Sequence, residues 1–166
     1  MNDNVCDYIL LTALRDCIEL RKTMNTHGLS DENGALSSVS CLLDFLSCRR
    51  KYGLTRVIDL KKSSTAERTI GVTLSLQLGH AIRVEHIYTQ RQWALWFIEK
   101  VDDGLNDREL LSFIDQHYRL ILVTLVQYRA LRKIIIPRVG FARFDYINLR
   151  LDKPGLIFPA SSTQLH

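Results

Sequence analysis

Three helix-start signals follow one another between residues 82 and 133, and they constrain the fold more than any other feature of the sequence. Each is a capping box, in which a Thr or Asn side chain accepts a hydrogen bond from a backbone N–H three residues later, and a Gln or Glu side chain bonds back. The boxes are Thr89–Gln92, Asn106–Glu109 and Thr124–Gln127. They predict three helices, one beginning directly after each Thr or Asn.

Two apolar runs, Ile82–Tyr88 and Tyr118–Val123, lie before the first and the third of these helices. Short runs of this kind are typical of buried strands, and we expect the two runs to share one small sheet. Trp93, Trp96 and Phe97 of the first helix are expected in the core rather than in a platform for stacked bases. The sequence therefore predicts a β-α-α-β-α core over residues 82–136.

Two longer amphipathic patterns precede this core. Val5–Met24 carries apolar residues at three- and four-residue steps, and Leu36–Leu46 repeats the pattern before Gly53 ends it. Two helices joined by a short polar loop bury their apolar faces most simply by packing against each other. We therefore expect residues 1–53 to form a helical pair.

The segment between the helical pair and the core, residues 54–81, is ambiguous. From Ile70 to Leu78, apolar residues alternate with Gly, Thr, Ser and Gln, and this period of two favours a strand. The pair Ser64–Glu67 has the spacing of a capping box, however, and Ile70, Leu74 and Leu78 share one helical face. We favour the strand and keep the helix as the alternative.

Length and composition indicate one domain over residues 1–166, with residues 137–166 as an irregular tail after Pro137. The predicted fold class is α+β, mostly helical. The four cysteines fit no zinc-site spacing and are expected as reduced, buried thiols. No apolar run reaches the roughly 18–20 residues that a membrane span needs. We expect a cytoplasmic protein without a membrane partner, a metal or another cofactor.

Positive charge is concentrated in two blocks. Residues 49–68 carry seven basic and two acidic side chains, a net of +5, and residues 129–153 have the same balance. If the fold joins the blocks, one basic patch would suit an acidic protein surface or a phosphate backbone. The alternative is two solvated helix ends, where cations are favourable anyway. The candidate binding residues are Arg49, Arg50, Lys51, Arg56, Lys61, Lys62, Arg129, Arg132 and Lys133.

Glu85-His86, at the end of the first predicted strand, is followed by two hydrophobic residues and a turn. This motif resembles the first motif of HNH-type nucleases, and the wider pattern resembles small bacterial and mobile-element proteins. The resemblance implies that His86 activates water beside a divalent metal, with Asn106 and His117 as the downstream Asn and His. The chain departs from that family at Tyr88-Thr89, where a proline is usual, and it has no paired CxxC clamp.

The same residues also have structural explanations. In a strand, His86 shares a face with Ile82 and Val84 and would bond a neighbouring backbone group, while Glu85 points to the opposite face, beside Arg83, as an exposed pair. Asn106 is explained as a helix cap and His117 as a residue that closes a helix.

The sequence has neither a Gly-x-Ser-x-Gly nucleophile motif nor a glycine-rich phosphate loop. This favours a non-enzymatic protein-binding module, such as an inhibitor or adaptor from a phage or plasmid, of the anti-CRISPR type. Its expected partner is a protein or ribonucleoprotein complex with an acidic surface. The alternative is a nucleic-acid-binding, HNH-like protein that cleaves with metal and His86. The oligomeric state is left open.

Overall fold

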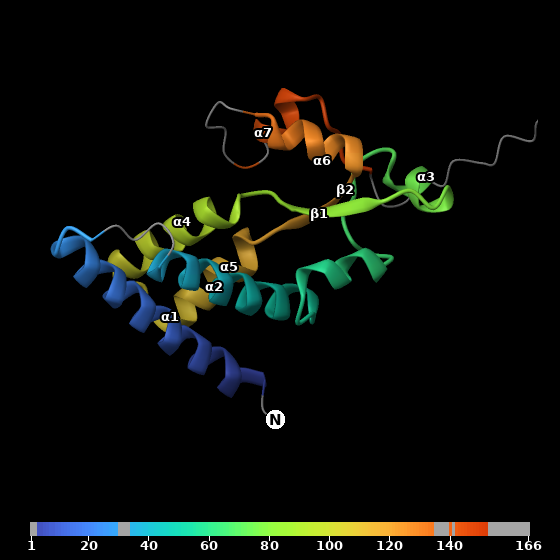
Figure 1. Ribbon diagram of the computed structural model, residues 1–166. Helices are drawn as coiled ribbons and strands as arrows, with labels where there is room; N and C mark the ends of the chain where they lie inside the picture. The colour runs from blue at the N-terminus through green and yellow to red at the C-terminus, as the bar shows by residue number, and fades with distance from the viewer. Residues whose placement is uncertain (1–2, 30–33, 135–139, 141, 153–166) are drawn as a thin grey trace, which may run out of the picture.

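The fold is organised around a two-stranded antiparallel sheet with helices on both of its faces (Figure 1). The computed structural model describes residues 3–29, 34–134, 140 and 142–152. Within these ranges the protein is a mostly helical α+β fold, as predicted. The elements are α1 Asp3–Thr26, α2 Ala35–Tyr52, the 3₁₀ helix η1 Val57–Lys62, α3 Val72–Gln77, β1 Ile82–His86, α4 Gln90–Asp102, α5 Asp107–His117, β2 Leu120–Thr124, α6 Leu125–Arg132 and α7 Ala142–Tyr146.

All three predicted capping boxes form, and each opens the predicted helix. Thr89, Asn106 and Thr124 are the N-caps of α4, α5 and α6, and in each box both reciprocal hydrogen bonds are present. The β-α-α-β-α order is therefore confirmed, with shorter strands than predicted. β1 ends at His86 and β2 begins at Leu120, because the residues beside them lead into turns and caps.

The two strands divide the hydrophobic core into two parts. Ile82 pairs with Thr124 and His86 with Leu120, and side chains along each strand alternate between the two faces. Leu120 and Leu122 point into the larger part with α1, α2, α4 and α5, whereas Ile121 and Val123 point into the smaller part under α6 and α7. The sheet thus separates the side chains of α2 from the side chains of α6.

The larger part of the core contains the predicted N-terminal helical pair. α1 packs along α2, and α2 packs in turn on α4 and α5 (Figure 1). Trp93 and Phe97 of α4 are buried, as predicted, whereas Trp96 is only partly buried where it packs against the core. The Trp93 ring stacks on the Phe113 ring at a centroid distance of 5.3 Å. Aromatic contacts of this kind lock α4 and α5 together beneath the sheet.

The strand favoured for residues 70–78 is wrong. Arg68 and Thr69 each make one bridge, with Leu122 and Leu151, and the extended run then ends at Gly71, whose φ of +94° turns the chain. The helix α3 begins at Val72, so the helical alternative is correct for this short stretch only, and its start is not at Ser64.

The tail is described in part. α7 and the Leu151 bridge fall in the predicted irregular region, while residues 135–139, 141 and 153–166 lie outside the described residues. None of the helices within the described ranges combines the length and the apolar character needed to cross a membrane.

Candidate functional site

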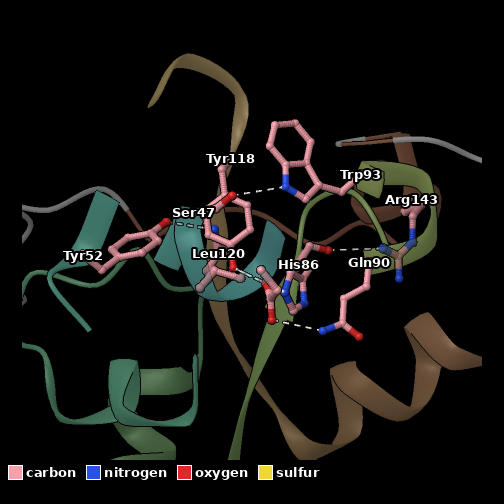
Figure 2. Close-up of polar contacts among 9 residues, drawn as sticks. Ser47, Tyr52, His86, Gln90, Trp93, Tyr118, Leu120 and Arg143 are labelled. Carbon is pink, nitrogen blue, oxygen red and sulfur yellow. Dashed lines mark hydrogen bonds and ion pairs between the residues drawn. The ribbon is translucent and has the colours of Figure 1, made fainter. Parts of the chain in front are cut away.

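A cluster of polar side chains lies where α2 crosses the larger-core face of the sheet (Figure 2). Its centre is the carboxylate of Asp44. The His86 ring Nε2 lies 2.7 Å from Asp44 Oδ1, the Tyr118 hydroxyl donates to the same oxygen, and the Gln90 amide donates to Oδ2 at 3.0 Å. We call these four residues the Asp44 cluster.

Two turns of the chain, β1–α4 and α5–β2, meet α2 at the Asp44 cluster. His86 is the last residue of β1, Gln90 is the first residue of α4, and Tyr118 immediately follows α5. Asp44 comes from the middle of α2, and the side chains of His86 and Asp44 are only 16% and 13% exposed. The local signals for these elements were visible in the sequence, but their convergence on Asp44 depends on the packing of α2.

Electrostatics keep the Asp44 carboxyl ionised and the Tyr118 hydroxyl protonated at neutral pH. Burial favours the neutral acid form of Asp44, but the hydrogen bonds and charge of His86, with the bonds from Tyr118 and Gln90, outweigh it and lower the pKa of Asp44. Burial first, and the Asp44 charge second, raise the pKa of Tyr118. Asp44 therefore stays ionised while the Tyr118 hydroxyl stays protonated and donates to it.

The neighbouring groups limit what the cluster can do chemically. A carboxylate that orients an imidazole is the arrangement used to position a general base. Burial, followed by the charges of Asp44 and Asp59, raises the pKa of the adjacent Cys48 thiol to about 11, so this thiol is not a ready nucleophile. Among the described residues, no group of three or more His, Cys, Asp or Glu side chains is placed to hold a metal ion.

The expected surroundings of Glu85 and His86 need correction. They do point to opposite faces, but His86 bonds the Asp44 carboxylate rather than a backbone group. Glu85 forms a buried ion pair with Arg143 at 2.8 Å, not an exposed pair with Arg83. Both partners come from elements distant in sequence, α2 and α7, so inspection of the strand alone could not identify them.

Asn106 and His117, the other residues of the nuclease-like pattern, each have a structural role. Asn106 Oδ1 accepts from the Glu109 N–H at the start of α5. The His117 ring packs against Trp96 and Phe113, with centroid distances of 4.8 Å to each. Neither side chain is hydrogen-bonded to His86 in the described structure, so the pattern is not assembled as one hydrogen-bonded site.

The first basic block is largely occupied by intramolecular partners. Its bonds are Arg50 to Asp7 at 2.6 Å and to Asp115 at 2.5 Å, Lys51 to the Asp115 carbonyl at 2.9 Å, and Arg56 and Lys62 to Asp59, each at 2.9 Å. Arg56, and then Lys62, lower the pKa of Asp59 to about 2. Arg49 and Lys61 are partly buried. Much of this block's charge is therefore balanced within the protein.

The second basic block lies on the other side of the sheet. Arg129, Arg132 and Lys133 are exposed at the C-terminal end of α6, with no carboxylate partner in the described part of the chain. We call these three residues the α6 basic face. Because α6 covers the smaller core while α2 and η1 adjoin the larger one, the two blocks lie on elements at opposite faces of the sheet (Figure 1).

An exposed apolar surface was missed by the sequence reasoning. Ile70, Leu74 and Leu78 are 58%, 58% and 59% exposed, and Val126 at the start of α6 is 76% exposed. We call these four residues the α3 apolar surface. The period of two predicted that half of the run would be buried, and the helical alternative grouped Ile70, Leu74 and Leu78 on one face of a helix. In the structure α3 spans only Val72–Gln77, Val72 is its buried residue, and Leu76 is 42% exposed as well.

Comparisons of the chain with protein-family models, with curated proteins and with solved structures find no match. The resemblance of Glu85-His86 to HNH-type nucleases therefore stays a prediction. The Asp44 cluster, the α6 basic face and the α3 apolar surface are the features from which a function can be inferred.

Proposed function

We propose that the protein is a non-enzymatic protein-binding module, an inhibitor or adaptor of the type that phages and plasmids direct against host defence complexes. The observation that carries the proposal is the α6 basic face. Its three cations are exposed and have no carboxylate partner in the described structure, whereas most of the first block is balanced internally. A cluster of exposed cations without carboxylate partners favours a binding partner with an acidic surface.

The side chains around the cations favour a protein partner over a nucleic acid. Proteins that hold single strands place exposed aromatic rings among the basic residues so that bases can stack. Tyr52 and Tyr128, next to Lys51 and Arg129 in sequence, are partly buried against the core. Tyr146, within residues 129–153, is 50% exposed, but it lies on α7 rather than on α6. The Tyr52 hydroxyl also accepts from the Leu120 N–H at 2.9 Å. The side chain exposed beside Arg129 is instead the aliphatic Val126.

An HNH-like nuclease that uses His86 is the second candidate. The observation that favours it is the 2.7 Å contact between Asp44 and His86, since an imidazole held by a carboxylate can act as a general base. Against it, the Asp44 oxygens also accept from Tyr118 and Gln90, which makes the pair part of a buried structural junction.

Affinity capture from host lysate tests the protein-binding proposal. Wild-type protein is compared with Arg129→Ser/Lys133→Ser and with the matched control Arg56→Ser/Lys62→Ser, which removes the same two side-chain types from the other block. We expect a defined protein partner that survives nuclease treatment and is lost with the α6 variant alone. Loss of all recovered material on nuclease treatment, or an equal loss with both variants, would contradict the proposal.

A further inference from the structure

The α3 apolar surface lies beside the first turn of α6, the helix that carries the α6 basic face at its other end. Thr69 Oγ1 donates to Gln127 Oε1 at 2.6 Å, and Gln127 Nε2 donates to the Ile70 carbonyl at 3.0 Å. These bonds join the residues before α3 to the first turn of α6. Ile70 is therefore held beside that turn, which also carries Val126.

Charge and apolar character continue along one face of α6. Arg129 and Lys133 follow Val126 by three and seven residues, and residues at these spacings lie on the same side of a helix. Arg150 adds another exposed cation beside the apolar surface, since its carbonyl accepts from the Ile70 N–H at 3.0 Å. The Thr73 hydroxyl of α3 donates to the neighbouring acid, Asp152, at 3.4 Å. The segments beside the apolar surface thus carry three exposed cations, Arg129, Lys133 and Arg150, and one acid that is itself hydrogen-bonded.

We propose that this combined surface binds an acidic segment of a partner protein that presents apolar side chains to Leu74, Leu78 and Val126 and carboxylates to Arg129 and Lys133. The inference rests on the proposed function and specifies the chemistry of its partner. Exposed apolar clusters rimmed by charge mark interaction sites, and opposite charge around an apolar anchor sets register and orientation.

Other occupants fit the surface less well. A second copy docked through the same face would bring Arg129, Lys133 and Arg150 of both copies into one interface, because a two-fold interface is made of the same patch from each copy. The repulsion between these like charges opposes association. A nucleic acid would engage the cations, but its bases would find no aromatic ring to stack on among the four aliphatic side chains.

The test uses three labelled peptides of equal length and fluorescence anisotropy. The first carries Leu at four-residue steps flanked by Glu, the second replaces each Glu with Lys, and the third replaces each Leu with Ser. We expect the full-length protein to bind the first peptide at least about tenfold more tightly than either control peptide. Equal binding of the first and third peptides would overturn the inference, as would equal binding of the first and second.

Variants assign the binding to the proposed surface. Leu74→Ser/Val126→Ser and Arg129→Ser/Lys133→Ser should each weaken binding of the first peptide by about tenfold or more. The matched controls Ile9→Ser, at an exposed apolar position on α1, and Arg56→Ser/Lys62→Ser should not change it. All four positions changed in the two test variants are exposed, and circular dichroism melts check that these variants stay folded.

Further measurements distinguish the other occupants. Tighter binding of an oligo-dT strand than of the peptide would assign the surface to nucleic acid, and dimerisation that is lost with Leu74→Ser/Val126→Ser would assign it to a second copy. Each result overturns the inference. If the protein does not distinguish the three peptides but still captures a partner through the α6 basic face, the inference fails and the proposed function stands. If the protein binds the first peptide selectively but captures no partner, the proposed function alone is contradicted.

Discussion

At the residue scale, Asp44 is a largely buried carboxylate kept ionised by neighbours from two other parts of the chain, the β1–α4 turn and the residue that follows α5. Its burial alone would raise its pKa, and the bonds from His86, Tyr118 and Gln90 reverse that effect. An ionised, multiply bonded carboxylate of this kind fixes the position of α2 on the sheet. It also makes the folded state sensitive to acid.

We expect Asp44→Asn to lower the free energy of unfolding at neutral pH by about 2 kcal/mol, because hydrogen bonds to a charged acceptor are lost. The folded pKa of Asp44 is below its unfolded value of about 3.9, so its contribution is full above that pH and disappears as pH falls through the folded pKa. Urea unfolding should show the difference between wild type and variant shrinking below about pH 4. A difference that is independent of pH would contradict this prediction.

The same cluster leads us to expect no metal-dependent nuclease activity. Both Asp44 oxygens are occupied by hydrogen-bond donors, and the His86 side chain is largely buried. Plasmid DNA incubated with the purified protein and Mg²⁺ or Mn²⁺ should stay intact, with a known nuclease as positive control. Cleavage that disappears with His86→Ala would instead establish the second candidate function.

At the element scale, local signals predicted the helix starts and non-local contacts decided the rest. A capping box lies within four residues and forms whenever the helix forms, so the starts of α4, α5 and α6 could be read from the sequence. The secondary structure of residues 70–78 depends on whether a strand partner is present and on the positive φ of Gly71. The period of the apolar residues encodes neither.

Gln127 should contribute more to stability than the equivalent residue of another capping box. Its side chain bonds the Thr124 N–H, the Thr69 hydroxyl and the Ile70 carbonyl, whereas Glu109 bonds the Asn106 N–H at 2.8 Å. We expect Gln127→Ala to cost about 2–3 kcal/mol and Glu109→Ala about 1 kcal/mol. Denaturant unfolding measures both values, and equal costs would show that the bonds to Thr69 and Ile70 contribute little.

The attachment of α7 to β1 depends on a buried ion pair. The Glu85 and Arg143 side chains are 12% and 8% exposed, and Arg143 also donates to the His86 carbonyl at 3.2 Å. Arg143→Ala leaves Glu85 buried without its partner and should lower stability by about 3–5 kcal/mol, whereas Glu85→Leu/Arg143→Met should cost much less. Thermal or urea unfolding distinguishes the variants. A double variant as unstable as Arg143→Ala would contradict this account.

At the scale of the whole molecule, the sheet decides which charges can act together. The sequence identified both basic blocks but could not show that they lie on elements at opposite faces of the sheet, nor that Asp7, Asp59 and Asp115 bond much of the first block. Those three carboxylates come from positions before, within and well after the block. Charge counting along the chain left open one joined patch or two solvated helix ends. The tertiary structure separates the blocks, and the cations of the α6 basic face are exposed and have no carboxylate partner among the described residues.

The salt dependence of partner binding should reflect the charges of the α6 basic face. A nucleic acid that met several cations would give a steep line, since each neutralised phosphate contributes about −0.9 to the slope of log K against log salt. A protein partner anchored on Leu74, Leu78 and Val126 should give a shallower slope, because apolar burial is little affected by screening at moderate salt. Arg129→Ser/Lys133→Ser should flatten the slope further, while Leu74→Ser/Val126→Ser should weaken binding equally at every salt concentration.

Titration of the captured partner against salt, for the wild type and both variants, measures these slopes and affinities. A slope of several units that is unchanged by Leu74→Ser/Val126→Ser, with affinity also unchanged, would assign the surface to nucleic acid and reverse the choice of partner class.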